Sequence, residues 1–158
     1  MPRITPFFWF DGLAEEAADF YVSIIPNSRI VHVTHFPDNP RFEAGKVMIV
    51  EFELDRQRFI ALNGGPQFKF TEAMSLAVDC DTQDDIDHYW HRLTDDGGRE
   101  VQCGWRKDRY GVSWQVTPTI IGKLMASGDA TQRARVMAAM LPMVKIDIAA
   151  LQKAWDGM

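Results

Sequence analysis

Hydrophobic and polar positions change period several times along the first part of the chain. An apolar, aromatic run at 4–10 predicts a buried strand, and Asp11 after it is placed to cap a helix. From 13 to 25 apolar residues recur at helical spacing, until Pro26 ends the helix because proline lacks a backbone N–H. Runs rich in β-branched residues then predict three strands, at 29–36, 46–54 and 57–63.

The second half of the chain repeats this order of elements. An alternating segment at 75–80 predicts a strand, and a helical period follows at 82–95. Gly97 and Gly98 end that helix, and further strands are expected at 99–107 and 112–117. A strand, a helix and then more strands, found twice, predict an α+β fold of two βαβββ modules.

The chain after Pro118 has a different pattern, in which small residues and methionines occur at helical spacing. This pattern predicts helices at 119–127, 130–141 and 149–155. We therefore expect a single domain with four parts, which are module one at 1–64, a linker at 65–73, module two at 74–118 and a helical extension at 119–158.

Composition narrows the class of protein. Of the 158 residues 46% are hydrophobic and 25% are charged, which is typical of a globular domain. No window approaches the roughly 18 apolar residues that span a bilayer, and a net charge of -5 argues against nucleic-acid binding. The N-terminus lacks the cleavage site of a secretory signal. We expect a cytoplasmic protein with neither a membrane nor a nucleic acid as partner.

Histidines and cysteines are the first candidates for metal or redox chemistry. His88 and His91 share one side of a predicted helix, but that side lies opposite the apolar one, so we interpret both as solvent-exposed. Cys80 and Cys103 do not make a disulfide framework, and neither has a basic neighbour in sequence that would activate a thiolate. We interpret them as structural thiols.

Several phrases in both halves are shared with one protein family. They are TPFFWFDG at 5–12, AEEA at 14–17, FY at 20–21, DHYW at 87–90, GG at 97–98, CGW at 103–105, DRYGVSWQ at 108–115, Pro118, RVM at 135–137, Met143 and KIDI at 145–148. With these phrases the chain resembles the PhnB-like branch of the glyoxalase, bleomycin-resistance and dioxygenase superfamily, also called vicinal oxygen chelate proteins. Members of this branch are often labelled demethylubiquinone methyltransferases.

The resemblance implies that the two modules curve around a cavity and that the protein is a homodimer. Metalloenzymes of the superfamily hold an ion at four strand positions, which motif spacing puts near Thr5, Asn63, Ser75 and Gln115. Neutral hydroxyl and amide oxygens supply no charge for a catalytic transition metal. We therefore expect no tightly bound metal and no other cofactor.

Because side chains alternate along a strand, every second residue from these four positions is expected to face the same cavity. The candidate ligand-binding residues are Thr5, Phe7, Trp9, Asn63, Ser75, Asp79, Trp105, Ser113 and Gln115. Aromatic walls with a few polar groups predict a small, partly aromatic ligand. The alternative interpretation is that these aromatic side chains only fill the core.

The sequence thus predicts a glyoxalase-fold protein that binds a small molecule, and it leaves open whether a reaction is catalysed. The alternative is a metal-dependent lyase, isomerase or dioxygenase of the same superfamily with ligands elsewhere, such as Asp79 or Glu51. Methyl transfer is not expected, because no glycine-rich loop follows a strand to hold S-adenosylmethionine.

Overall fold

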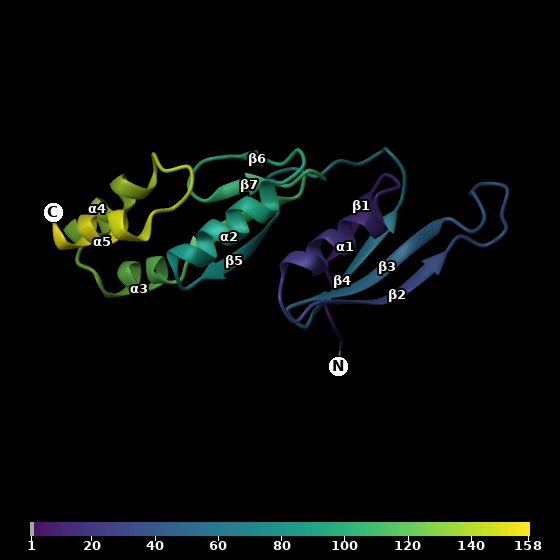
Figure 1. Ribbon diagram of the computed structural model, residues 1–158, viewed down its shortest axis with the longest axis horizontal. Helices are drawn as coiled ribbons and strands as arrows, with labels where there is room; N and C mark the ends of the chain where they lie inside the picture. The colour runs from purple at the N-terminus through teal and green to yellow at the C-terminus, as the bar shows by residue number, and fades with distance from the viewer. Residues whose placement is uncertain (1) are drawn as a thin grey trace. The chain divides into compact units, whose positions relative to one another are not determined.

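The chain forms two compact units, which divide between Phe70 and Thr71. The computed structural model describes residues 2–158 and is drawn as a ribbon in Figure 1. Each unit contains one four-stranded mixed sheet, and three further helices follow the second sheet. The prediction of a repeated α+β architecture with a C-terminal helical part is confirmed.

The sheet of the first unit has the strand order β1-β4-β3-β2. Strand β1 pairs with β4 in parallel, whereas β3 is antiparallel to both β4 and β2. The elements of this unit are β1 (Phe7–Phe10), α1 (Ala14–Ile24), β2 (Arg29–His35), β3 (Val47–Leu54) and β4 (Gln57–Asn63).

Helix α1 lies on one face of this sheet (Figure 1), and its buried side includes three small side chains. Ala14, Ala17 and Ala18 are fully buried, so the helix backbone approaches the strands closely. The buried ring of Tyr21 then lies against Phe52 of β3, with 6.4 Å between the ring centroids. These contacts form the core of the first unit.

The N-terminus of α1 is capped by Asn63, so the expectation that Asp11 caps it is wrong. The backbone N–H of Ala14 donates to Asn63 Oδ1 at 2.9 Å, and Asn63 Nδ2 donates to the carbonyl of Val47 at 3.0 Å. Gly12 turns the chain with a φ of 76°, so the helix begins beyond the reach of the Asp11 side chain. Both ends of the Asn63 amide therefore join α1 to the sheet.

A two-residue turn joins β3 to β4, as the sequence predicts, although it contains no glycine. Leu54 pairs with Gln57 across the turn. Asp55 and Arg56 take φ values of 44° and 66°, the left-handed conformation that a hairpin turn of this length requires at both positions. The strand pairing on either side therefore imposes a conformation that these two residues rarely adopt.

The sheet of the second unit has the strand order β5-β8-β7-β6. Strand β5 pairs with β8 in parallel, and β7 is antiparallel to both β8 and β6. The elements are β5 (Ser75–Cys80), α2 (Gln83–Thr94), β6 (Arg99–Glu100), β7 (Trp105–Lys107), β8 (Ser113–Pro118), α3 (Ile120–Ser127), α4 (Ala130–Met140) and α5 (Ile148–Asp156).

The strand predicted at 99–107 is interrupted, which makes β6 and β7 short. Between them Cys103 and Gly104 have positive φ values of 57° and 79°. Their backbone N–H groups donate to the carbonyls of Met143 at 2.7 Å and Val144 at 2.9 Å. The chain leaves the sheet here because its hydrogen bonds go to the C-terminal extension instead.

The extension, defined here as residues 119–158, is held against α2 by a polar contact. The side-chain amide of Gln83 donates to the carbonyl of Ile146 at 3.1 Å and accepts from the N–H of Ile148 at 3.0 Å. Lys145 Nζ lies 2.6 Å from Asp87 Oδ1, and its hydrogen bond holds the pKa of that carboxyl below its usual value. The contact therefore fixes one segment of the extension at three points.

Behind this contact the extension has its own apolar core. Leu124, Val136, Ile146 and Leu151 are buried together. The guanidinium of Arg135 donates to the last carbonyls of α5, at Ala154 and Trp155, where the end of a helix favours a cation. Across residues 2–158 the structure contains no helix that combines the length and the apolar character needed to cross a bilayer.

Candidate functional site

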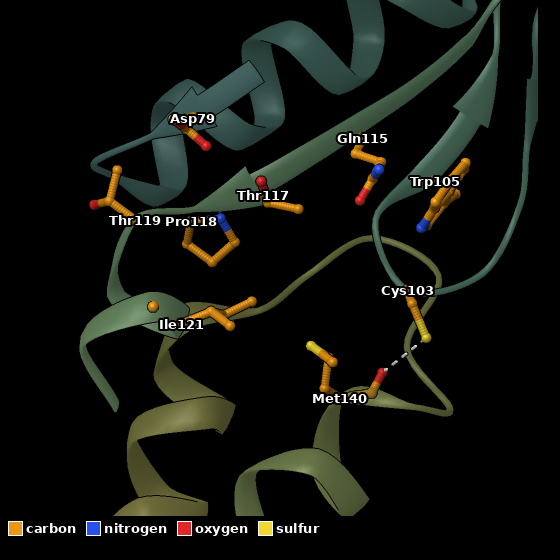
Figure 2. Close-up of a pocket in the computed structure, with 10 residues that line it drawn as sticks. Asp79, Cys103, Trp105, Gln115, Thr117, Pro118, Thr119, Ile121 and Met140 are labelled. Carbon is orange, nitrogen blue, oxygen red and sulfur yellow. Dashed lines mark hydrogen bonds between the residues drawn. The ribbon is translucent and has the colours of Figure 1, made fainter. Parts of the chain in front are cut away.

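A cavity of about 490 Å³ lies in the second unit, over the face of the sheet that points away from α2 (Figure 2). Along β8 the side chains alternate, so Trp114 and Val116 are buried whereas Gln115 and Thr117 line the cavity. The residues that line it are Asp79, Cys103, Trp105, Gln115, Thr117, Pro118, Thr119, Ile121, Gly122 and Met140. This volume is within the range of small-molecule sites.

Three strands place the polar and aromatic groups of this cavity side by side. Trp105 on β7 is the direct cross-strand partner of Gln115 on β8, and Asp79 on β5 is the partner of Thr117. Figure 2 shows the Trp105 ring and the Gln115 amide on neighbouring strands. An aromatic face therefore adjoins an amide, which can hydrogen-bond the polar edge of a stacked ligand.

A hydrogen bond fixes the orientation of the Gln115 amide. Gln115 Nε2 donates to Ser75 Oγ at 2.8 Å, so the amide oxygen is the acceptor that Gln115 can offer to a ligand. Two of the residues predicted for the site, Ser75 and Gln115, are thus in direct contact. Ser75 acts here by positioning Gln115 and does not itself line the cavity.

The charge of the cavity comes from one carboxylate. Among the residues that the structure describes around it, Asp79 is the one acidic side chain and no Lys, Arg or His is present. The Thr119 hydroxyl donates to Asp81 at 2.8 Å. An anionic ligand would meet uncompensated negative charge, whereas a neutral or cationic ligand with hydrogen-bond donors would be stabilised.

The remaining predicted residues are Ser113 and those of the first unit. Ser113 is only 1% exposed, is absent from the wall of this cavity, and its Oγ has no hydrogen-bond partner among residues 2–158. In the first unit Trp9 and Asn63 line a hollow of that unit, together with Phe36 and Lys46 among others. Thr5 is half-buried just before β1, and the Phe7 side chain is 54% exposed.

Contacts within the first unit explain the roles of Trp9 and Asn63 there. Trp9 Nε1 donates to the carbonyl of Gly65 at 2.8 Å, and its ring meets Phe68 edge-on with 5.0 Å between centroids. Asn63 uses both ends of its amide on backbone groups. Each polar group therefore has a structural partner, and we place the candidate site in the second unit.

Sequence reasoning missed the wall that the extension supplies to this cavity. Ile121 and Gly122 come from α3, and Met140 comes from α4. Cys103 faces them and donates through Sγ to the carbonyls of Leu141 at 3.2 Å and Met140 at 3.7 Å, the latter drawn in Figure 2. Alternation along β8 predicts that Thr117 faces the cavity. No sequence pattern predicts which residues of the extension reach the sheet.

The four positions implied for a metal do not fit one. Ser75 and Gln115 bond to each other, and both amide atoms of Asn63 bond to backbone groups. All four side chains, including Thr5, are neutral oxygen or nitrogen donors, whereas Zn or Fe sites are built from imidazole, thiolate and carboxylate. Within residues 2–158 no group of three or more His, Cys, Asp or Glu side chains is arranged to hold an ion.

The two cysteines should differ in reactivity. Burial, and then the nearby carboxylates of Asp85, Asp79 and Asp81, raise the pKa of the Cys80 thiol to about 12. Cys80 therefore stays protonated until the pH approaches that value, whereas Cys103 lies in the cavity wall. At pH 8 we expect a thiol reagent to modify one cysteine per native chain and both in denaturant. A Cys103→Ser variant should lose the native reaction, and rapid modification of Cys80 in that variant would contradict this account.

The paired mixed sheets, each crossed by one helix, define a glyoxalase-fold protein of the vicinal oxygen chelate superfamily. Residues 2–117 match the model of a family described as 3-demethylubiquinone-9 3-methyltransferase, and the chain belongs to that family. No curated protein matches it.

Solved structures agree with this family. The chain is 37% identical to a putative 3-demethylubiquinone-9 3-methyltransferase, PhnB protein, from Bacillus cereus, with a TM-score of 0.68 over 75% of this chain and 100% of that one. Protein PA1353 from Pseudomonas aeruginosa is 20% identical, with a TM-score of 0.61 over 75% and 98%. The fosfomycin resistance protein FosX from Listeria monocytogenes, solved with Mn(II) and sulfate, is 13% identical, with a TM-score of 0.54 over 80% and 98%. The last two show the fold alone.

Proposed function

We propose that this protein binds a small, partly aromatic, neutral or amine-bearing molecule in the cavity of its second unit, without a tightly held catalytic metal. The observation that carries the proposal is the pairing of Trp105 with Gln115 across β7 and β8, in a cavity where, among the described residues that line it, Asp79 is the one charged group. The ligand ring stacks on Trp105, its polar edge bonds the Gln115 amide oxygen, and a hydroxyl or ammonium donates to Asp79.

The strength of such binding depends on a few groups. A neutral hydrogen bond to Gln115 contributes about 0.5–1.5 kcal/mol, and an aromatic pair with Trp105 adds a similar amount beyond its buried area. Ser75 holds the amide in place before the ligand arrives, so little side-chain entropy is lost on binding. Gln115 and Trp105 are therefore the residues whose replacement should change affinity most.

The proposal is tested with fragments found by thermal-shift screening of neutral and amine-bearing aromatic compounds. Gln115→Leu should weaken binding about tenfold, because about 1.4 kcal/mol corresponds to a factor of ten. Trp105→Ala should weaken it at least as much. Gln57→Leu, the same replacement at an exposed position of β4, is the matched control and should bind as the wild type does. Equal binding by all four proteins in calorimetric titrations would overturn the proposal.

The metal content separates this proposal from a metal-dependent lyase, isomerase or dioxygenase. Because the four superfamily positions are neutral, and Asn63, Ser75 and Gln115 are bonded within the protein, we expect protein purified without chelator to hold far less than one Fe, Ni, Zn or Mn per chain. Elemental analysis is the measurement. One tightly bound ion per chain, lost on replacing Gln115 or Asp79, would favour the metal-dependent alternative.

Methyl transfer, the activity in the family description, is not part of the proposal. Cofactor-binding sheets of the doubly wound type hold phosphate and ribose groups at a glycine-rich turn between parallel strands. In each unit here a single strand pair is parallel, β1 with β4 and β5 with β8. A sheet with one parallel strand pair does not form the doubly wound site that holds such a cofactor.

We also propose that the protein is a homodimer and that it is cytoplasmic. Large apolar side chains exposed on the described chain support a subunit contact, among them Phe7, Phe68, Leu141 and Val144. Dimer interfaces with an apolar core cover residues of this kind. The cavity itself is built from residues of one unit of one chain.

A further inference from the structure

The wall that faces the sheet in the candidate site comes from outside the matched family region. The family match ends at residue 117, and the Bacillus cereus protein aligns over its whole length with only 75% of this chain. Ile121, Gly122 and Met140 all lie beyond that match, yet they line the cavity. Figure 2 shows Ile121 and Met140 across the cavity from Gln115. The extension therefore adds a wall to the part of the site that the matched region provides.

This wall is fixed in place at several points. The backbone N–H of Thr119 donates to the carbonyl of Cys80 at 2.9 Å, which ties the start of α3 to the end of β5. Met140 packs against the buried core of the extension, and Gln83 holds the segment before α5. A wall anchored at both ends defines the shape of a cavity, whereas a loose segment would not.

Gly122 has no side chain to fill the space at its position in this wall. It lies in the first turn of α3, where glycine is among the least favourable residues for a helix. Apart from its chain neighbours and the backbone of its own helix, a Cβ added there would meet no atom of residues 2–158 within 4 Å, so no close tertiary contact requires glycine at this position. Gly128 shows the opposite case, because a Cβ there would collide with the ring of Trp155. Gly122 therefore leaves space at the cavity rim.

We propose that the extension sets the size of the ligand, and that the space at Gly122, on the same cavity wall as Ile121 and Met140, receives an apolar substituent of the bound ring. The inference rests on the proposed function, since it needs a ligand stacked on Trp105. The substrate class is then an aromatic molecule with a hydroxyl or amine at one end and a short alkyl group at the other. The polar end of the molecule hydrogen-bonds Gln115, and the alkyl end makes apolar contacts with the extension.

The test uses para-cresol, para-propylphenol and para-pentylphenol, titrated calorimetrically into wild type, Gly122→Ala, Gly122→Leu and Ala126→Leu. Each buried methylene should tighten wild-type binding roughly three- to fourfold. Gly122→Leu should weaken para-pentylphenol at least tenfold and leave para-cresol within twofold. Ala126→Leu, an exposed position on the same helix outside the cavity wall, should change neither.

A measurement without ligand tests the open space directly. Gly122→Ala and Gly122→Leu should each raise the melting temperature by a few degrees, because the helix gains a better residue and nothing is displaced. A lower melting temperature would show that the space is not open and would overturn the inference. Equal effects of Gly122→Leu on the short and long phenols would also overturn it, with the proposed function intact. Failure of every phenol to bind the wild type would remove the proposed function and this inference together.

Discussion

Replacing Asp108 with alanine is expected to lower the free energy of unfolding by about 3–5 kcal/mol. Asp108 is 3% exposed, in the loop between β7 and β8. Its Oδ1 accepts from the N–H groups of Tyr110 at 2.9 Å and Val112 at 3.1 Å, and its Oδ2 accepts from Trp114 Nε1 at 2.8 Å. Truncation removes these charge-assisted bonds and leaves buried donors without an acceptor.

A buried cation adds to this cost. The Arg106 guanidinium is fully buried over the ring of Trp90, 4.4 Å from its centroid, and its nitrogens have no hydrogen-bond partner. Burial lowers the pKa of Arg106 to about 10, and the carboxylates of Glu100, Asp95 and Asp108 act against that shift. Without Asp108 the buried charge has one counter-charge fewer.

Urea unfolding followed by Trp fluorescence is the measurement for Asp108→Ala. Asp108→Asn keeps the shape and one acceptor oxygen, so it should cost less than alanine does. Asp38→Ala, at an exposed loop position of the first unit, is the control for loss of a carboxylate and should stay within about 0.5 kcal/mol of the wild type. A loss below about 1 kcal/mol for Asp108→Ala would contradict this role.

Deleting the extension after Pro118 is the second change with a large expected effect. It removes the acceptors of the Cys103 and Gly104 N–H groups, and it takes Ile121 and Met140 away from the cavity that they line together with the apolar ring of Trp105. We expect the truncated chain to aggregate, with an earlier thermal transition, because exposed apolar surface associates. Size-exclusion chromatography and thermal unfolding by circular dichroism measure both effects.

A point variant separates docking of the extension from its mere presence. Gln83→Ala removes the amide that bonds Ile146 and Ile148, at a cost of about 1–2 kcal/mol. Gln152→Ala, whose side chain bonds only Asp156 on its own helix, is the matched control and should be near neutral. A truncated chain that stays dispersed and unfolds at the wild-type temperature would show that the second unit folds without its extension.

Much of the fold could be predicted because hydrophobic periods are local. The change from a strand run to helical spacing at 13–25, and its repetition at 82–95, are visible in sequence and correspond to α1 and α2. The interrupted strand at 99–107 could not be predicted in this way. Its backbone hydrogen bonds go to Met143 and Val144, some forty residues further on, and no local pattern records such a partner.

The site was predictable for the same reason only along single strands. Alternation on β8 identifies Gln115 as a cavity residue, with Thr117 on the same side. The same alternation also points to Ser113, which the structure buries outside the wall of this cavity. Gly122 and Met140 could not be found, since their positions depend on how the extension docks.

We infer that a ligand binds in the second unit, between Trp105 and the extension. The most direct test of this inference is a heteronuclear NMR titration with the tightest fragment from the thermal-shift screen, in which the 5 tryptophan indoles report separately. We expect saturable shifts of the Trp105 indole and the Gln115 side-chain amide, with the Trp9 indole unchanged. Shifts confined to Trp9 and Asn63, with Trp105 and Gln115 unmoved, would contradict it.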